Sequence, residues 1–348
     1  MEVCTTTEEA ALSILRRSYA ILRVESSTAE SIQSSWLAAK QFFVSTVLDD
    51  DDKHVAGGHD GDARRRIVNG ALYGYNVPSD AKRLFRSICS DQAKEVQPWP
   101  DDLDRGHLRR SSIDAASRLH ALLIDCLEEL KAVAATTRSA TDEMEEPSFT
   151  VVSDRTQRTV GSVGGDFDTG HRRKRQRTLL STTAAVSGKS CNLFIPRSMN
   201  EAQYCPLDYF LYNNNRGRRN ENCSEHVDRG ILICVALTHV PGLEVFCRES
   251  NRYVCPELIA KGEALLGERC SGCSDLVCVM AGDQLKEALA AMSGRQGEDV
   301  HAPMGSTLTN TSACVHRVRN RLERARLSLT YELRGEHGNI KIIGMERS

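Results

Sequence analysis

Residues 226–230 read His-Val-Asp-Arg-Gly, and they run directly into the apolar stretch Ile231–Leu237. In a strand, residues two apart point to the same face, so His226 and Asp228 can present an imidazole and a carboxylate to one metal ion. His316 supplies a second imidazole further along the chain. Two histidines and a carboxylate can hold mononuclear non-haem Fe(II) and leave coordination positions open. We therefore treat these three as candidate iron ligands, against the alternative of a surface histidine beside a solvated aspartate.

The composition indicates a globular intracellular protein. The chain has 348 residues, 40% of them hydrophobic, and a formal net charge of -2, so no global field attracts nucleic acid or an anionic membrane. Thirteen cysteines are scattered along it, and Glu2, Glu8 and Glu9 stand where a signal peptide would be basic. The apolar run Ile231–Leu237 is too short to span a bilayer. We expect free thiols and a cytoplasmic location, with the nucleus as the alternative.

The first part of the chain, residues 1–135, is mostly helical in pattern. Apolar residues recur at intervals of three and four in Ser31–Val47 and in Ser112–Ala135, which predicts two amphipathic helices. A shorter helix is predicted over Asp80–Cys89, with Ser79 or Asp80 as its N-cap. The acidic run Asp49–Asp52 is expected in a solvated loop.

Residues 136–190 are rich in Ser, Thr, Gly, Asp and Arg and predict a disordered insert. The basic cluster at residues 171–177 within it is either a nuclear localisation signal that binds an import factor or a solvated charge run.

After Asn192 the pattern changes to short apolar runs separated by turn residues, which is typical of strands. Many short strands after a helical part predict an α+β fold, with a jelly-roll (double-stranded β-helix) core in residues 191–348 and the helical N-terminal region packed on it. The predicted strands are Leu207–Tyr212, Gly230–Leu237, Gly242–Phe246, Arg252–Cys255, Leu276–Met280, Ala313–His316 and Leu327–Leu333.

The order of motifs in this part resembles the isopenicillin N synthase-like branch of the Fe(II)/2-oxoglutarate dioxygenases. After the His-x-Asp-x-Gly of residues 226–230 come Val240-Pro241-Gly242-Leu243, Gly282-Asp283, His316-Arg317-Val318 and Arg326-Leu327-Ser328. Asp228 precedes Gly242 by fourteen positions and His316 precedes Arg326 by ten, which fits the spacing in that family. The resemblance covers most of the chain, more faintly upstream, and leaves the insert outside it.

The resemblance implies a set of roles. His226, Asp228 and His316 would bind Fe(II), while Arg326 and Ser328 would bind the distal carboxylate of the cosubstrate 2-oxoglutarate, for which a guanidinium fork is well suited. Tyr212 would contact the cosubstrate as well, although a core tyrosine is the alternative. The implied activity is hydroxylation or desaturation of a small molecule by O₂, with decarboxylation of 2-oxoglutarate to succinate, and ascorbate is a further candidate cofactor.

Two stretches, near residues 257–274 and 288–307, are longer than the family pattern and are expected to be loop insertions. The first contains Cys270 and Cys273, which together with Cys255 and Cys278 could bind a structural zinc ion or stay free thiols. Two alternatives to the leading function remain open. One is an iron-dependent oxidase of the isopenicillin N synthase type that uses no 2-oxoglutarate, and the other is a non-catalytic binding module on the same fold.

Overall fold

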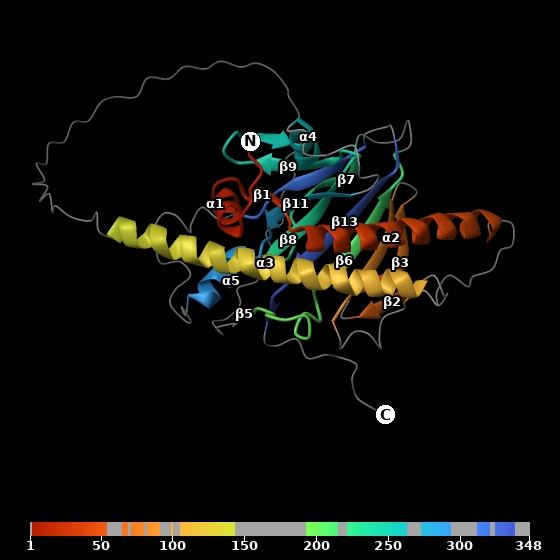
Figure 1. The fold of residues 1–348 in the computed structure, drawn as a ribbon, viewed down its shortest axis with the longest axis horizontal. Helices are drawn as coiled ribbons and strands as arrows, with labels where there is room; N and C mark the ends of the chain where they lie inside the picture. Colours follow the sequence, from red (N-terminus) through yellow and green to blue (C-terminus); the bar gives the residue numbers. More distant parts are fainter. Residues whose placement is uncertain are drawn as a thin grey trace, which may run out of the picture.

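A computed structural model describes residues 2–53, 65–68, 71–79, 82–90, 99, 105–142, 193–214, 221–262, 273–293, 312–320 and 324–337. It contains helices and antiparallel sheets built from both halves of the chain (Figure 1). The helices are α1 (Thr7–Arg17), α2 (Ser26–Lys53), α3 (Arg105–Asp142), α4 (Pro256–Gly262) and α5 (Leu285–Met292).

The larger sheet has eight strands in the order β1-β11-β8-β13-β6-β4-β3-β2, and we call it the major sheet. Its strands are β1 (Tyr19–Arg23), β2 (Arg65–Val68), β3 (Ala71–Ser79), β4 (Lys82–Ile88), β6 (Pro206–Tyr212), β8 (Leu232–Thr238), β11 (Cys273–Ala281) and β13 (Arg326–Leu333).

The minor sheet has four strands in the order β10-β9-β12-β7. They are β7 (Glu221–His226), β9 (Leu243–Cys247), β10 (Arg252–Val254) and β12 (His316–Arg319), while β5 (Leu193–Phe194) and β14 (Glu336–His337) form a separate pair. The two antiparallel sheets with helices beside them are the predicted jelly-roll core, so the predicted fold class is confirmed.

Strand β8 explains how the layers are held together. Its alternate residues Leu232, Cys234 and Ala236 belong to the core under the helices, whereas Ile233 and Val235 belong to the core shared with strands of the minor sheet. Because both faces are covered, β8 is buried throughout and its sequence is a continuous apolar run rather than an alternating one.

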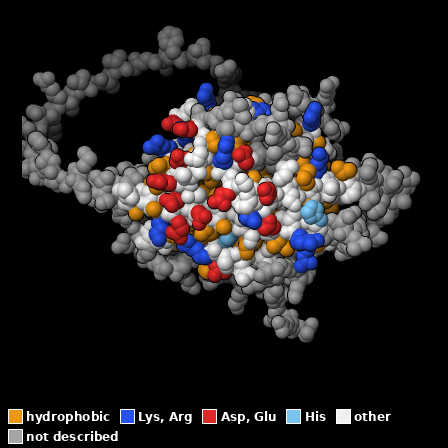
Figure 2. Space-filling model, viewed as in Figure 1, with side chains coloured by type: hydrophobic (Ala, Val, Ile, Leu, Met, Phe, Trp, Pro, Cys, Tyr) orange, Lys and Arg blue, Asp and Glu red, His pale blue; other side chains and the backbone are white. Residues whose placement is uncertain are grey.

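Helices α2 and α3 lie side by side and cross the major sheet over β8, β11 and β13 (Figure 1). Polar contacts attach them there. The Trp36 indole N–H donates to the Leu327 carbonyl at 3.0 Å, and the Tyr209 hydroxyl lies within hydrogen-bond distance of Ser35 and Ser112. On the face shown in Figure 2, acidic and basic side chains lie interspersed among apolar ones. Helices α2 and α3 therefore form an outer layer that packs on the major sheet.

The prediction of a helix over Asp80–Cys89 is wrong, because its described part from Lys82 onward is strand β4. This strand lies inside the major sheet, between β3 and β6. Leu84, Phe85 and Ile88 are all buried, so the apolar residues cover both faces and their spacing imitates a helix.

Residues 1–135 supply the predicted helices α2 and α3, and they also supply four strands of the major sheet. The acidic run Asp49–Asp52, expected in a loop, lies within α2 instead. Helix α3 continues to Asp142, which is inside the stretch expected to be disordered, and the rest of that stretch up to residue 190 lies outside the described residues together with the basic cluster at 171–177. The division of the chain at residues 135 and 190 stays a prediction.

The two expected loop insertions begin as helices in the described part of the chain. Helix α4 opens the first insertion, and the end of α5 opens the second. Of their remaining residues, 263–272 and 294–307 are not among the described ones, and residues 273–274 lie in β11. No described helix combines the length and the apolar character needed to cross a membrane.

Candidate metal centre

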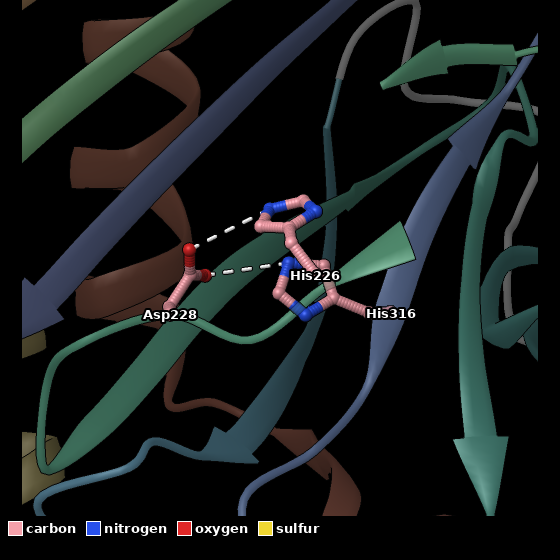
Figure 3. Close-up of side chains that lie close together, drawn as sticks. All are labelled: His226, Asp228 and His316. Carbon is pink, nitrogen blue, oxygen red and sulfur yellow. Dashed lines mark ion pairs between the residues drawn. The ribbon is translucent and has the colours of Figure 1, made fainter. Parts of the chain in front are cut away.

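His226, Asp228 and His316 converge although they come from different places in the fold (Figure 3). His226 ends β7 and His316 begins β12, and the two residues are directly opposite each other in the ladder that joins these strands. Asp228 follows in the connection from β7 to β8, where the chain passes from the minor to the major sheet. One ligand atom from each residue lies within 4.8 Å of the other two.

The carboxylate of Asp228 lies beside the two imidazoles and contacts both of them (Figure 3). Its Oδ1 is 3.6 Å from Nε2 of His226 and its Oδ2 is 3.3 Å from Nε2 of His316. Each ring turns its other nitrogen to a main-chain carbonyl two residues earlier, at 2.7 Å for Ser224 and 3.2 Å for Cys314. A proton on Nδ1 satisfies those carbonyls and leaves the Nε2 lone pair free for a metal ion, so the backbone selects the tautomer that ligation needs.

Glycines hold the Asp228 loop in place. The main-chain N–H groups of Asp283 and Gln284 donate to the carbonyls of Asp228 and Gly230, at 3.1 and 3.2 Å. A Cβ atom at Gly282 would lie 1.8 Å from the Gly230 carbonyl oxygen, so the two segments touch backbone to backbone. The two glycine-containing motifs, distant in sequence, therefore form one contact that fixes the position of the carboxylate ligand.

The charges at the centre act on one another. Burial raises the pKa of Asp228, but the hydrogen bond to His316 and the positive charges of both histidines outweigh it and hold that pKa below its ordinary value. A hydrogen bond with Cys223 is the largest cause that raises the pKa of His226, to about 9, with a smaller contribution from Asp228. In the metal-free protein the carboxylate thus stays ionised and His226 retains its proton over much of the neutral range.

The residues present fit a divalent iron ion. Two imidazole nitrogens and one carboxylate oxygen are available from one side, which is the donor set that iron oxygenases use and which leaves open positions. The side chains of His226 and Asp228 are 37% and 28% exposed, whereas that of His316 is 7% exposed. The cluster is therefore anchored on the His316 side and accessible on the other.

Arg326 and Tyr212 face each other across β13 and β6 of the major sheet. The Arg326 guanidinium carbon lies 5.9 Å from the centre of the Tyr212 ring, and both side chains are buried. Ser328 is two residues further along β13, on the same face as Arg326, and is also buried. Burial raises the pKa of Tyr212, on which the charges of Arg326 and Asp228 also act in opposite directions.

Glu257 was missed by the sequence reasoning. It lies in the first turn of α4, and its Oε1 accepts a hydrogen bond from Nη2 of Arg326 at 2.9 Å. The same oxygen is 3.5 Å from the main-chain N–H of Leu243, and Oε2 accepts from the Cys255 thiol at 3.2 Å. The only sequence signal was a carboxylate next to Cys255-Pro256 in an insertion, and nothing in that signal indicated its partner.

The four-cysteine zinc site stays a prediction. Cys270 lies outside the described residues, and the side chain of Cys273 is not described. Cys278 is buried in β11 with a raised pKa caused by burial, and Cys255 donates to Glu257. Among the described residues, the group with metal-binding geometry is that of His226, Asp228 and His316.

The sheets and the histidine–carboxylate cluster define a class: the chain has the fold of the Fe(II)/2-oxoglutarate oxygenases. Full-length T7H of Neurospora crassa, solved with alpha-KG and 5-formyluracil, matches at a TM-score of 0.54 and 14% identity over 95% of this chain and 79% of that one. A putative oxygenase from Shewanella oneidensis matches at a TM-score of 0.52 and 12% identity over 96% and 90%. Dioxygenase for auxin oxidation 1 of Arabidopsis thaliana, in a binary complex with 2-oxoglutarate, matches at 0.50 and 12% over 96% and 93%.

No family model matches the sequence, and neither does any curated protein sequence. The similarity is therefore one of fold, and the assignment to the isopenicillin N synthase-like branch stays a prediction.

Proposed function

We propose that the protein is an Fe(II)- and 2-oxoglutarate-dependent oxygenase that acts on a small molecule. The observation that carries this proposal is the convergence of His226, Asp228 and His316 to within 4.8 Å in a jelly-roll fold, with both Nε2 atoms directed at the carboxylate. Solved proteins of the same fold bind 2-oxoglutarate, and one of them was solved with a pyrimidine base, which supports a small-molecule substrate.

The residues have separate tasks in this function. His226, Asp228 and His316 would hold the iron, which when bound supplies the activation of O₂. The main-chain carbonyls of Ser224 and Cys314 keep both rings oriented for that task. Burial of His316 keeps water from one side of the centre, while the exposed side, near His226, leaves room for substrate.

Arg326, Ser328 and Tyr212 would bind the cosubstrate carboxylate. Nε of Arg326 is buried and has no hydrogen-bond partner among the described residues, so this guanidinium retains one donor for an anion. A buried donor without a partner is costly, so a ligand that satisfies it gains affinity. The chemistry of the pocket thus fits a carboxylate, although a carboxylate of the protein already contacts Nη2.

That contact favours a second candidate function, an iron-dependent oxidase that takes all electrons from its substrate and needs no 2-oxoglutarate. In that case the Arg326–Glu257 pair would stay intact during turnover. Ascorbate as a cofactor, an import factor at residues 171–177 and a location in the cytoplasm or nucleus remain predictions.

The test is an anaerobic titration of the Fe(II)-loaded protein with 2-oxoglutarate, followed by exposure to O₂ and measurement of succinate. We expect a weak visible absorption band on titration, because a 2-oxo acid chelates Fe(II) through its keto and carboxylate oxygens. Succinate should then form once O₂ is admitted. An Fe(II)-loaded protein that gives neither band nor succinate would contradict the proposal, and iron-dependent turnover of a substrate without succinate would establish the oxidase.

A further inference from the structure

Arg326 and Glu257 form a buried ion pair next to the position proposed for the cosubstrate. The side chains are 1% and 0% exposed, and the contact joins Nη2 to Oε1 at 2.9 Å. Glu257 is held by two further donors, the Cys255 thiol and the Leu243 main-chain N–H. The buried carboxylate of Glu257 therefore accepts hydrogen bonds from three donors, which fix its position beside Arg326.

Arg326 has little freedom to leave this pair. A Cβ atom at Gly242 would lie 3.0 Å from Cδ and 3.3 Å from Nε of Arg326, which shows that the arginine stem packs closely against the backbone there. Strand β13 is paired on both sides, with β6 and β8, so its backbone is fixed as well. If a ligand carboxylate is to take the Nη2 atom of Arg326, the group that gives way is Glu257.

Two carboxylates cannot share this arginine at low energetic cost. The pair is sealed from water, so a second negative charge beside Glu257 would be poorly screened and would repel it. The structure provides one buried cation and one buried anion at this place, and their charges already compensate each other. An incoming dicarboxylic acid therefore competes with Glu257.

We propose that Glu257 is a specificity-determining residue: it occupies the carboxylate position on Arg326 and lowers the affinity of the site for 2-oxo acids that carry a distal carboxylate. The inference rests on the proposed function, because it assumes that the acid chelates the metal held by His226, Asp228 and His316. It also goes beyond that function, since it states which 2-oxo acids the folded site prefers. In the wild-type protein, the distal carboxylate of 2-oxoglutarate gains little because Glu257 already holds Nη2 of Arg326 and its negative charge repels the ligand.

The experiment compares two acids that differ only at the distal end. 2-Oxoglutarate and 2-oxopentanoate share the chelating keto acid, but the second has a methyl group where the first has its distal carboxylate. Each is titrated anaerobically into the full-length Fe(II)-loaded protein, and the dissociation constant is taken from the chelate absorption band. The measured quantity is the preference, which is the ratio of the two dissociation constants.

In Glu257→Gln we expect the preference for 2-oxoglutarate to rise about tenfold or more, because charged hydrogen bonds to a buried arginine become available to the ligand. The affinity for 2-oxopentanoate should stay within about threefold. Glu244→Gln is the matched control: Glu244 also pairs with arginines, but these are Arg317 and Arg319 in the minor sheet. Its preference should equal that of the wild type.

Loss of the buried charge could prevent Glu257→Gln from folding, so Glu257→Asp is measured in parallel. It keeps the charge but shortens the side chain by one methylene, which weakens the internal competitor and should raise the preference by a smaller factor. A preference that is unchanged or lower in both variants, with chelates still forming, overturns the role of Glu257 and leaves the proposed function intact. If neither acid chelates the iron in any variant, both the proposed function and this inference fail.

Discussion

The metal end and the arginine end of the candidate site differ in how they are closed. At the metal end a carboxylate contacts two imidazoles, and two of the three side chains are about a third exposed. At the arginine end Arg326 and Glu257 are almost completely buried, with hydrogen bonds between them and to Cys255. The first end is arranged to accept an ion with little rearrangement. At the second end the positive charge of Arg326 is already compensated by Glu257, without a ligand.

This difference shows that the histidines are already oriented to bind a metal ion, whereas Arg326 is not yet free to bind a carboxylate. The histidines are oriented by the backbone, through carbonyls two residues earlier in the chain, so their donor atoms stay directed at the metal position without a ligand. Arg326 is oriented by the side chain of Glu257. The contact that orients the guanidinium therefore also occupies a donor that a ligand would need. Metal binding should therefore depend only on the presence of His226, Asp228 and His316. Binding of a carboxylate to Arg326 should depend on the removal of Glu257.

The largest expected effect is at the metal end. Asp228→Ala removes the carboxylate that contacts both Nε2 atoms. We expect metal affinity to fall by more than about a hundredfold, since changes to residues that merely orient ligands already cost roughly 10–100-fold. The bound metal is measured by elemental analysis after dialysis against Fe(II) or Mn(II) in the absence of O₂.

Asp283→Asn is the control for this change. Asp283 is nearby, but its contact with the Asp228 loop is made by its main-chain N–H, which the substitution keeps. Its metal content should match that of the wild type. A normal metal content in Asp228→Ala would show that the cluster is not a metal site and would remove the contrast between the two ends.

The second effect is on stability at the arginine end. Arg326→Gln leaves the Glu257 charge buried without its partner, and breaking a buried pair in this way costs about 3–5 kcal/mol. Urea unfolding of the metal-free protein measures the loss. Metal affinity should stay within about threefold, because Arg326 makes no contact with the ligand residues in the described structure.

The double variant Arg326→Gln with Glu257→Gln decides whether the pair itself is responsible. Removing both charges abolishes the unpaired carboxylate, so most of the lost stability should return. If the double variant were as unstable as the sum of the two single variants, the pair would contribute no coupling. The Arg326–Glu257 pair would then not be what stabilises the arginine end.

Sequence patterns could anticipate that His226, Asp228 and His316 come together, but they could not anticipate the Arg326–Glu257 contact, and the reason is physical. His226 and Asp228 are two residues apart, so a short local motif suggests that they share a metal ion. His316 was added through the order and spacing of the motifs that resemble the oxygenase family, and not through its own strand, which was expected to end at His316 but begins there. The Arg326–Glu257 contact joins residues that are 69 positions apart and depends on a short helix in a stretch expected to be a loop. No local pattern carries that information.

The same distinction holds for the fold. Most of the later strands were predicted because turns separate them and β8 is a continuous apolar run. Strand β7 was not predicted, because its residues are mostly polar and only partly buried. The strand expected over Ala313–His316 is wrong in its bounds, since β12 begins at His316 and continues to Arg319. Strand β4 was predicted as a helix because Leu84, Phe85 and Ile88 are buried on both faces of a strand in the interior of the sheet. A pattern of apolar residues reports which positions are buried. It does not report whether a neighbouring strand or the next helical turn covers them.

The smallest effect concerns the pH dependence of metal binding. It tests whether His226 carries a proton that the metal ion must displace. The pKa of His226 is raised to about 9, chiefly by the hydrogen bond with Cys223, so at neutral pH a metal ion must displace a proton from this ring. Metal affinity should therefore rise about tenfold per pH unit up to about pH 9, whereas a histidine with its ordinary pKa would stop contributing above about 6.5. Titration with Mn(II) at several pH values measures the slope.

The sign of the accompanying stability change follows from the same shift. Because the folded-state pKa is above the unfolded value, the contribution of His226 to the stability of the metal-free protein is complete below about pH 6.5 and is lost as pH rises through about 9. Cys223→Ala removes the largest cause, so both transitions should move towards pH 6.5 in that variant. A metal affinity in the wild type that is already constant between pH 6.5 and 9 would mean that His226 is neutral before the metal arrives. In that case all three ligand residues would be in the protonation state that binds metal before the ion arrives. The difference from the arginine end, where Glu257 must first be displaced, would then be larger.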